Sequence, residues 1–267
     1  MWEHRVVDKW RGRVVGCGEV RREVEEVEEG EEMDEKGSKL VVLERDRRII
    51  REIDRWRVCQ GRHIRELVGF SGQRACDRRL RKLVQAGYIS REKILYGVAG
   101  IYRVTSRGAR LEGLGNSKSK IRIEQIRHDI AVLDTAIYIG KVQEIEYKDI
   151  KTELELHRID GFGIRKHRPD FVFKKDGKTI CVEVELALKS KNRFENIISN
   201  NFMDYDRQIW VVPDLECKIA KTLLNSRTMY PNIEIMAISQ IQETKENEDN
   251  IQCNTNPMEP GQIDLEI

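Results

Sequence analysis

Several features that would assign a protein class at once are missing from this 267-residue chain. No apolar run approaches the roughly 18 residues that a membrane span needs, and no signal-peptide core follows Met1. We therefore expect a cytoplasmic protein without a membrane partner. The six cysteines are scattered and form no CxxC pair, a pattern typical of reduced, mostly buried thiols and not of a zinc ribbon or a disulfide framework.

Enzyme motifs are equally scarce. The five histidines are dispersed, without HExxH or HxH spacing. The absence of a GxxxxGK(S/T) motif disfavours an ATPase, and the Gly161-Phe162-Gly163 loop lacks the strand-to-helix context that cradles a nucleotide phosphate. No histidine cluster lies beside a tyrosine, which disfavours a relaxase that works through a covalent tyrosine intermediate.

Charge is abundant but strongly segregated. The formal net charge is only +2, although 35% of the residues are charged. Between Glu19 and Glu35 there are ten acidic residues against two arginines. Between Arg45 and Glu112 there are 18 Lys/Arg against 7 Asp/Glu, a local net charge of +11. A polyanion would meet this basic region, so its charge predicts binding better than the near-neutral total does.

Composition divides the chain into five segments. Hydrophobic residues make up 39% of the chain, which is enough for packed cores, but both ends are polar and lack hydrophobic periodicity. Gly113 to Lys120 has the Gly/Ser/Asn content of a linker. We expect an acidic, disordered tail at 1–40, a basic domain at 41–112, a linker at 113–120, a second domain at 121–240 and a disordered tail at 241–267.

The basic domain has the pattern of three helices followed by a hairpin. Helical spacing of apolar residues predicts helices from Val41, after Gly61, and from Gln73 to Ala86, the last with Ala75, Leu80, Leu83 and Val84 on its buried side. Gly69 to Gly72 forms the turn between the second and third helices. A hairpin at 88–104 and a further helix from Thr105 follow. This order predicts a winged helix-turn-helix.

The third helix of this domain is the expected recognition helix, and double-stranded DNA is the expected partner. Base edges are usually met at the N-terminal end of such a helix, where arginine can pair with guanine and glutamine with adenine. We assign base reading to Gln73 and Arg74, phosphate contacts to Arg78, Arg81 and Lys82, and wing contacts to Arg91 and Lys93. The alternatives are a merely solvated basic surface and a protein-interaction module.

The second domain alternates helices with strands. The pattern predicts a mixed sheet flanked by helices. The predicted helices lie at 121–139, 191–203 and 215–224, and the predicted strands at 142–147, 152–157, 170–173, 179–186, 208–212 and 233–238.

Acidic residues gather on three neighbouring strands of that sheet. Glu183 and Glu185 share a strand face because side chains alternate, and Asp170 opens the strand that pairs with theirs. Glu153 and Glu155 form a second same-face pair on the preceding predicted strand. Such carboxylates repel unless a cation or proton neutralises them, which suggests Mg²⁺ or Mn²⁺. A carboxylate patch without metal is the alternative, and His128 is expected to be a core histidine.

The spacing Pro169-Asp170 followed by Glu183-Val184-Glu185 resembles the PD-(D/E)xK nuclease fold. The resemblance implies that Asp170 and Glu183 are metal ligands, with Glu153 or Glu155 as a further ligand. The motif lysine is replaced by Glu185, and Lys189 or Lys191 could substitute for it. The candidate catalytic set is therefore Asp170, Glu183, Glu185 and Lys189. Loss of the motif lysine favours a non-catalytic domain over a Mg²⁺-dependent endonuclease, which stays the alternative.

The whole arrangement resembles the replication-relaxation family of plasmid and mobile-element proteins. The resemblance rests on Tyr102 to Gly108, Arg127 to Val132, Pro169 to Phe173 and Val182 to Lys191. It implies an α+β protein in which a winged helix-turn-helix precedes a restriction-endonuclease-like domain. It also implies an accessory role in plasmid replication or relaxation, with the element's replication or relaxation proteins and a second copy of the chain as candidate partners. A winged-helix transcriptional regulator is a further alternative.

Overall fold

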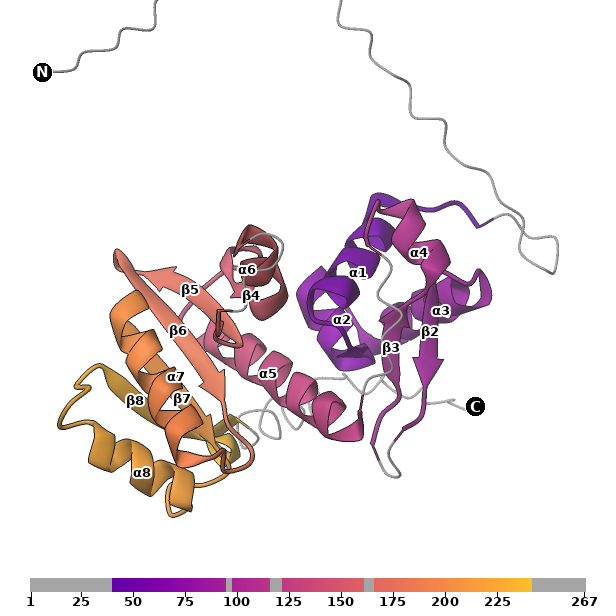
Figure 1. Cartoon of the computed structure of the whole chain (residues 1–267). Coiled ribbons are helices and arrows are strands. Elements are labelled where there is room, and N and C mark those ends of the chain that lie inside the picture. Colours follow the sequence, from indigo (N-terminus) through magenta and orange to yellow (C-terminus); the bar gives the residue numbers. More distant parts are fainter. Residues whose placement is uncertain (1–39, 95–97, 116–121, 161–165, 242–267) are drawn as a thin grey trace, which may run out of the picture.

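The computed structural model describes residues 40–94, 98–115, 122–160 and 166–241 (Figure 1). The expected N-terminal tail up to residue 39, most of the linker, the 161–163 loop and the C-terminal tail from 242 lie outside these residues. The described chain is an α+β protein with one three-stranded and one five-stranded sheet. Within it, no helix is long and apolar enough to cross a membrane.

The N-terminal part consists of helices gathered around a small antiparallel sheet. The strand order is β1-β3-β2, so the hairpin strands β2 and β3 pair with each other and β3 also pairs with the short β1. The elements are α1 (Glu44–Arg55), β1 (Cys59–Gln60), α2 (Gly61–Val68), α3 (Gln73–Gln85), β2 (Ile89–Glu92), β3 (Ile101–Val104) and α4 (Ser106–Leu111).

Helix α3 follows α2 through a tight turn. Gly69 ends α2 with φ 76°, a left-handed conformation that favours glycine. Cys76, Leu80 and Leu83 are fully buried on α3, at the i, i+4, i+7 spacing of one helix face. Ala75 was expected on this face but is exposed, because Cys76 takes the inward position one residue later.

Helix α4 is locked against the start of β2. Thr105 caps α4, since its Oγ1 accepts the N–H of Gly108 at 3.1 Å and donates to the carbonyl of Gly87 at 2.6 Å. Gly108 packs directly on Tyr88, where a Cβ atom would lie only 2.2 Å from the backbone oxygen. The Thr105-Ser106-Arg107-Gly108 segment therefore fixes the hairpin relative to α4.

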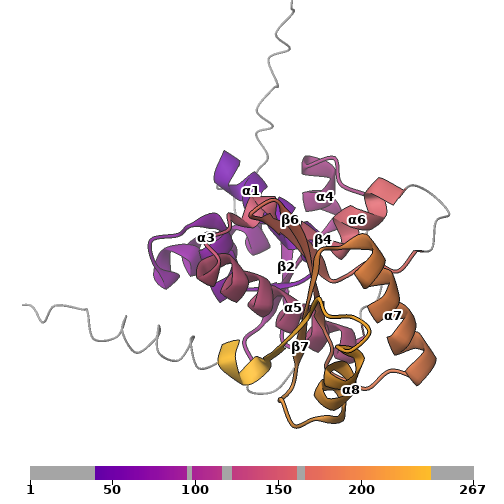
Figure 2. The same ribbon diagram turned by 90° about the vertical axis from the view of Figure 1, so that its left-hand side faces the viewer.

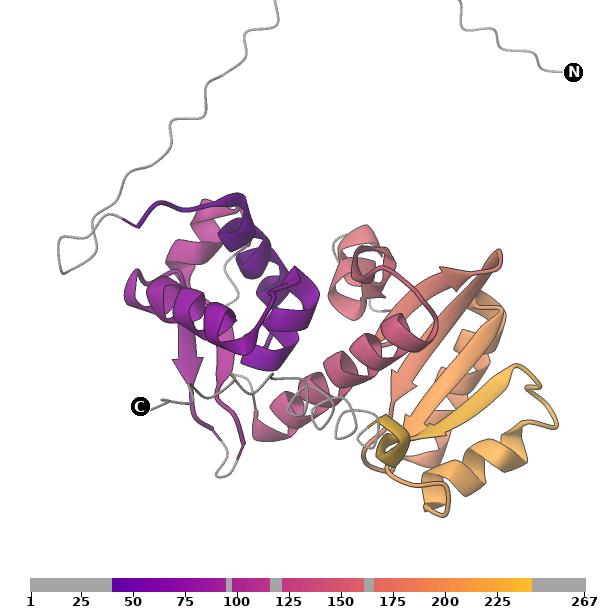
Figure 3. The same cartoon turned by 180° about the vertical axis from the view of Figure 1, so that it is seen from behind.

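The C-terminal part is a five-stranded mixed sheet between helices (Figures 1 and 3). The strand order is β4-β5-β6-β7-β8, antiparallel from β4 to β6 and parallel from β6 to β8. The elements are α5 (Ile123–Val142), the 3₁₀ helix η1 (Tyr147–Asp149), β4 (Lys151–Thr152), α6 (Glu153–Asp160), β5 (Phe171–Lys175), β6 (Lys178–Val184), α7 (Lys191–Asp204), β7 (Arg207–Val212), α8 (Lys218–Ser226) and β8 (Ile233–Ala237).

Two predicted strands of this part are wrong. Residues 142–147 complete α5 and lead into η1, and of the strand predicted at 152–157 only Thr152 belongs to a strand. Thr152 and Glu155 form a capping box: the Glu155 carboxylate accepts the N–H of Thr152 at 2.8 Å, and Thr152 Oγ1 accepts the N–H of Glu155 at 3.4 Å. The cap starts α6 at Glu153, so Glu153 and Glu155 lie on a helix and not on a strand face.

Helices cover both faces of the large sheet. On β7, Ile209 and Val211 share a buried cluster with residues of α5, such as Leu133, whereas Trp210 and Val212 share another with α7 and α8. This alternation is what the period-2 geometry of a strand requires. The α5-side cluster also includes buried residues of α1, α2 and α3, so one continuous core joins the N-terminal and C-terminal parts.

Candidate functional site

Helix α3 and strand β2 carry an exposed basic surface. All seven side chains expected to contact DNA there are exposed: Gln73, Arg74, Arg78, Arg81, Lys82, Arg91 and Lys93. Among the residues that the structure describes, none of the six cations in this set forms an ion pair. Gln73 donates from Nε2 to Oδ1 of Asp77 at 2.8 Å. The hairpin tip at 95–97 lies outside the described residues.

Other arginines of the N-terminal part are committed to carboxylates. Arg47 contacts Glu112 at 3.0 Å, and Arg79 pairs with the fully buried Asp46. A further three, Arg55, Arg57 and Arg62, reach carboxylates of the C-terminal part. The cations on α3, on β2 and at Lys93 just after β2 are not committed in this way and face solvent.

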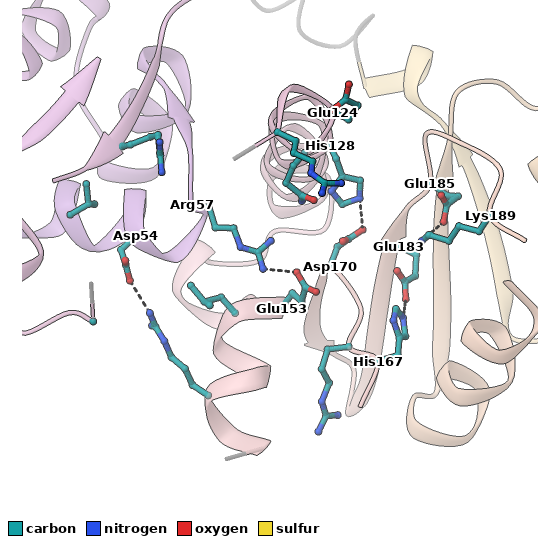
Figure 4. Close-up of a pocket in the computed structure, with 18 of the residues that line it drawn as sticks. Asp54, Arg57, Glu124, His128, Glu153, His167, Asp170, Glu183, Glu185 and Lys189 are labelled. Carbon is teal, nitrogen blue, oxygen red and sulfur yellow. Dashed lines mark hydrogen bonds and ion pairs between the residues drawn. The ribbon is translucent and has the colours of Figure 1, made fainter. Parts of the chain in front are cut away.

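A cleft of about 740 Å³ lies between the two parts (Figure 4). It is bordered by β3, the first half of α5, α6, the segment before β5, the end of β6 and the start of α7. Figure 2 shows α3 on one side of the molecule and α6 and α7 on the other. The sequence-predicted residues that line the cleft are Glu153, Asp170, Glu183, Glu185 and Lys189.

Glu155 and Lys191 do not take part in this cleft. Both oxygens of Glu155 lie 3.0 Å from Nε of Arg55, outside the cleft lining. Lys191 is exposed at the start of α7 and lies 3.8 Å from Glu195. Glu155 was expected to share a strand face with Glu153, but on α6 these two residues are about 200° apart around the helix axis.

Asp170 lies beside a histidine in the cleft. Its Oδ2 accepts the N–H of Val184 at 2.7 Å and is 3.6 Å from Nε2 of His128, which donates to the carbonyl of Val184 at 3.0 Å. Burial raises the pKa of Asp170, and the nearby charge of Glu183 adds to this effect, whereas His128 opposes it. Burial acts in the opposite sense on His128, but Asp129 and Asp170 outweigh it and raise the pKa of that ring.

His128 is therefore not the satisfied core histidine that was expected. Its side chain is 29% exposed and lines the cleft. Its Nδ1 atom has no hydrogen-bond partner within the described part of the chain. The sequence shows only the adjacent pair His128-Asp129 on a predicted helix. This pair indicates a functional site only when Asp170 is known to lie beside it.

Glu183 is buried, and two side chains contact its carboxylate. Its Oε1 is 2.7 Å from Nε2 of His167 and accepts from Nδ2 of Asn201 at 2.8 Å. Glu185 was expected on the same strand as Glu183 but is the first residue after β6, and it pairs with Lys189 four positions later. His167 and Asn201 were missed from the sequence, because the first lies in a loop and the second on α7, a segment read only for its apolar face.

Glu153 is held by the N-terminal part of the chain. Its Oε2 accepts from Nη2 of Arg57 at 2.8 Å, and its backbone N–H donates to the carbonyl of Asp170 at 2.9 Å. Arg57 had no predicted site role. Figure 4 shows it reaching from the α1 side toward Glu153 and Asp170.

The Mg²⁺ or Mn²⁺ expected from the sequence stays a prediction. Within the described ranges, no three acidic, histidine or cysteine side chains lie close enough to share one metal ion. The physical reason is that each carboxylate turns toward its own partner: Glu153 toward Arg57, Asp170 toward His128 and the Val184 N–H, Glu183 toward His167 and Asn201, Glu185 toward Lys189.

The chain was compared with known protein families, curated proteins and solved structures. No family model matches it, no curated protein matches its sequence, and no solved structure matches its fold. The resemblances to PD-(D/E)xK nucleases and to the replication-relaxation family therefore stay predictions.

Proposed function

We propose that this protein binds double-stranded DNA through α3 and the β2–β3 hairpin, in the manner of a winged helix-turn-helix. The observation that carries the proposal is the set of solvent-facing cations on α3 and β2 that form no ion pair within the described residues. Cations left free in this way can release counterions from DNA, which supplies most of the affinity of such proteins.

The order of residues along α3 suggests a division of labour. Gln73 and Arg74 form the first turn, where a recognition helix meets base edges, and Arg78, Arg81 and Lys82 follow in the next two turns, where phosphates are closer. Gln73 is bound to Asp77 in the free protein, so it has to release that carboxylate before it can contact adenine.

Fluorescence anisotropy with a labelled 30-base-pair duplex, titrated at several salt concentrations, tests the proposal. We expect the triple variant Arg78→Ala/Arg81→Ala/Lys82→Ala to bind more weakly and to lower the log–log salt slope by about one unit per lost phosphate contact. The control is Lys174→Ala/Lys178→Ala, which removes exposed cations at the β5–β6 turn. An equal loss of affinity in the control would overturn the assignment to α3.

We further propose an accessory, non-catalytic role for the C-terminal part in plasmid or mobile-element replication. Its support is that every carboxylate expected to bind a metal ion is already paired with a protein group. The endonuclease alternative keeps one argument, that Asp170, Glu183, Glu185 and Lys189 line one cleft.

Incubation of supercoiled plasmid with the protein and Mg²⁺ or Mn²⁺ separates these two roles. We expect the supercoiled form to persist under conditions in which DNA binding is measurable. Conversion to open circle that is abolished by both Asp170→Ala and Glu183→Ala would contradict the non-catalytic role and support the endonuclease.

A further inference from the structure

The end of α1 and the two residues that follow it contact the C-terminal part of the chain. Four successive residues, Asp54 to Arg57, each contact it through their side chains. The contacts are Asp54 with Arg158 at 2.9 Å, Arg55 with Glu155 at 3.0 Å, Trp56 with Phe171 ring to ring at 6.2 Å, and Arg57 with Glu153 at 2.8 Å. These four contacts together position the Arg57 side chain.

Arg57 has an unusual backbone as well as an unusual position. Its φ of 65° lies in the left-handed region, which costs a residue other than glycine or asparagine about 1–2 kcal/mol. The packing of Trp56 and the ion pairs of Arg55 and Arg57 offset this cost. The guanidinium is thereby directed at carboxylates that lie far away in the sequence.

Three carboxylates surround this guanidinium. Nη2 of Arg57 contacts Glu153, Nη1 lies 3.7 Å from Oδ1 of Asp129, and Arg57 lines a cavity of about 20 Å³ together with Asp129, Glu153 and Asp170. Burial lowers the pKa of Arg57, but the charges of these three carboxylates outweigh it and leave the pKa raised. The guanidinium therefore stays charged at this position.

One carboxylate oxygen of the cluster lacks a hydrogen-bond donor among the described residues. Asp129 is only 5% exposed, and its Oδ2 is buried with no hydrogen-bond partner among the described residues. Oδ1 of the same residue accepts from Nε2 of Gln125 at 2.7 Å. A buried carboxylate oxygen without a donor is costly, so the cluster retains capacity for a further cationic ligand.

We propose that Arg57 is the resident counter-cation of the Asp129, Glu153 and Asp170 cluster, and that it closes the cluster to divalent metal ions while α1 is docked. A divalent ion needs several carboxylate oxygens turned toward one point, whereas Arg57 turns Glu153 toward α1. Removal of the guanidinium frees Glu153 and converts the cluster into a divalent cation site. This inference goes beyond DNA binding and does not depend on it.

Titration of the full chain with Mn²⁺, followed by calorimetry and by the electron spin resonance of free Mn²⁺, tests the proposal. Arg57→Asn is the informative variant, because asparagine removes the charge and tolerates a positive φ. We expect it to bind one Mn²⁺ at least tenfold more tightly than the wild type. Adding Asp170→Asn to this variant should return the affinity to the wild-type level.

Two controls separate the local charge from the docking contact. Arg57→Lys keeps a positive charge at the cluster and should bind Mn²⁺ as weakly as the wild type. Arg158→Gln removes the neighbouring ion pair to Asp54 without touching the cluster, and should also behave as the wild type.

Two outcomes overturn the proposal. One is stoichiometric binding of Mn²⁺ by the wild type with the affinity of Arg57→Asn. The other is a folded Arg57→Asn protein, with the circular dichroism of the wild type, that gains no Mn²⁺ affinity. If Arg57→Asn does not fold, Arg57→Gly takes its place, since glycine suits the backbone conformation. Because no DNA is present, neither outcome depends on the DNA-binding proposal.

Discussion

His63 and Asp134 lie 71 positions apart in the sequence, and Nε2 of His63 is 2.8 Å from Oδ1 of Asp134. Nδ1 of the same ring accepts the N–H of Gln60 at 3.1 Å, so Nε2 carries the proton and donates it to the carboxylate. Arg62 donates to both oxygens of Asp134. These bonds attach α2, which leads into α3, to α5 of the C-terminal part.

Replacing Asp134 should destabilise the protein measurably. Asp134→Asn removes the charge that Arg62 and the fully buried His63 share, and we expect a loss of about 1–3 kcal/mol in the free energy of unfolding. Urea unfolding measured by circular dichroism at pH 7 gives the value. Asp149→Asn, at an exposed position, is the control and should change stability by less than about 0.5 kcal/mol.

The stabilisation by Asp134 should depend on pH in one direction. Burial raises the pKa of Asp134, but hydrogen bonds from His63 and Arg62 outweigh burial and hold the pKa well below its usual range. A carboxyl whose pKa is lower in the folded state stabilises the protein fully above the unfolded pKa of about 3.9, and less as the pH falls. The difference in unfolding free energy between wild type and Asp134→Asn should therefore shrink as the pH falls below about 4. A difference that grows on acidification would contradict this assignment.

A single added methyl group at Gly108 should be severely destabilising. A Cβ atom there would meet the oxygen of Tyr88 at 2.2 Å and Cγ1 of Val104 at 3.2 Å, so α4 has to move away from the hairpin. Gly108→Ala should cost about 3 kcal/mol or more in thermal or urea unfolding. Gly115→Ala, where no atom lies within 4 Å of the new Cβ, is the matched control and should be close to neutral.

Asn201 should matter far more than its neighbour Asn200. Asn201 is 2% exposed and donates to the buried Glu183, whereas Asn200 is exposed on the same helix. Asn201→Ala leaves Glu183 with His167 alone, and we expect a loss of about 1–3 kcal/mol in unfolding free energy. Asn200→Ala should change the same quantity by less than about 0.5 kcal/mol. Equal effects would show that the Asn201–Glu183 bond contributes nothing.

The two ends of α3 should affect DNA binding differently. Selection of preferred sites from a random duplex library gives a sequence preference, against which each variant is measured. Arg74→Ala should relax the preference at one position and cost about 1–3 kcal/mol at the preferred site. Arg78→Ala should weaken binding to all duplexes alike. The reverse result would exchange the roles assigned to the two arginines.

The secondary structure of strongly periodic segments was predictable. The second and third predicted helices correspond to α2 and α3, and the strands predicted at 208–212 and 233–238 agree with β7 and β8 within one residue. Prediction was wrong between 142 and 157, where apolar residues alternate but a Thr152–Glu155 capping box starts a helix. Strand β1 was also missed, because its two residues become a strand only by pairing with β3.

The cleft was predictable in part. Asp170, Glu183, Glu185 and Lys189 are close in sequence, and strand pairing brings them together. Arg57, His128 and His167 come from the segment after α1, from α5 and from a loop, and each lines the cleft through packing that no local pattern reports. Asn201 of α7 is buried and contacts Glu183 from behind the cleft lining. These four residues supply protein partners for the carboxylates that were expected to bind a metal ion.

The sequence by itself determined where positive charge is concentrated and that the cations expected on the outer face of α3 are exposed, because composition and helical periodicity are local properties. Only the tertiary structure decided which arginines are free. Arg57 and Arg62 have the same side-chain chemistry as Arg74 and Arg78, but packing of α1 and α2 on the C-terminal part brings carboxylates 96 and 72 positions away within hydrogen-bonding distance of the first two. Arg74 and Arg78 form no ion pair within the described chain, so their charge remains available to a partner.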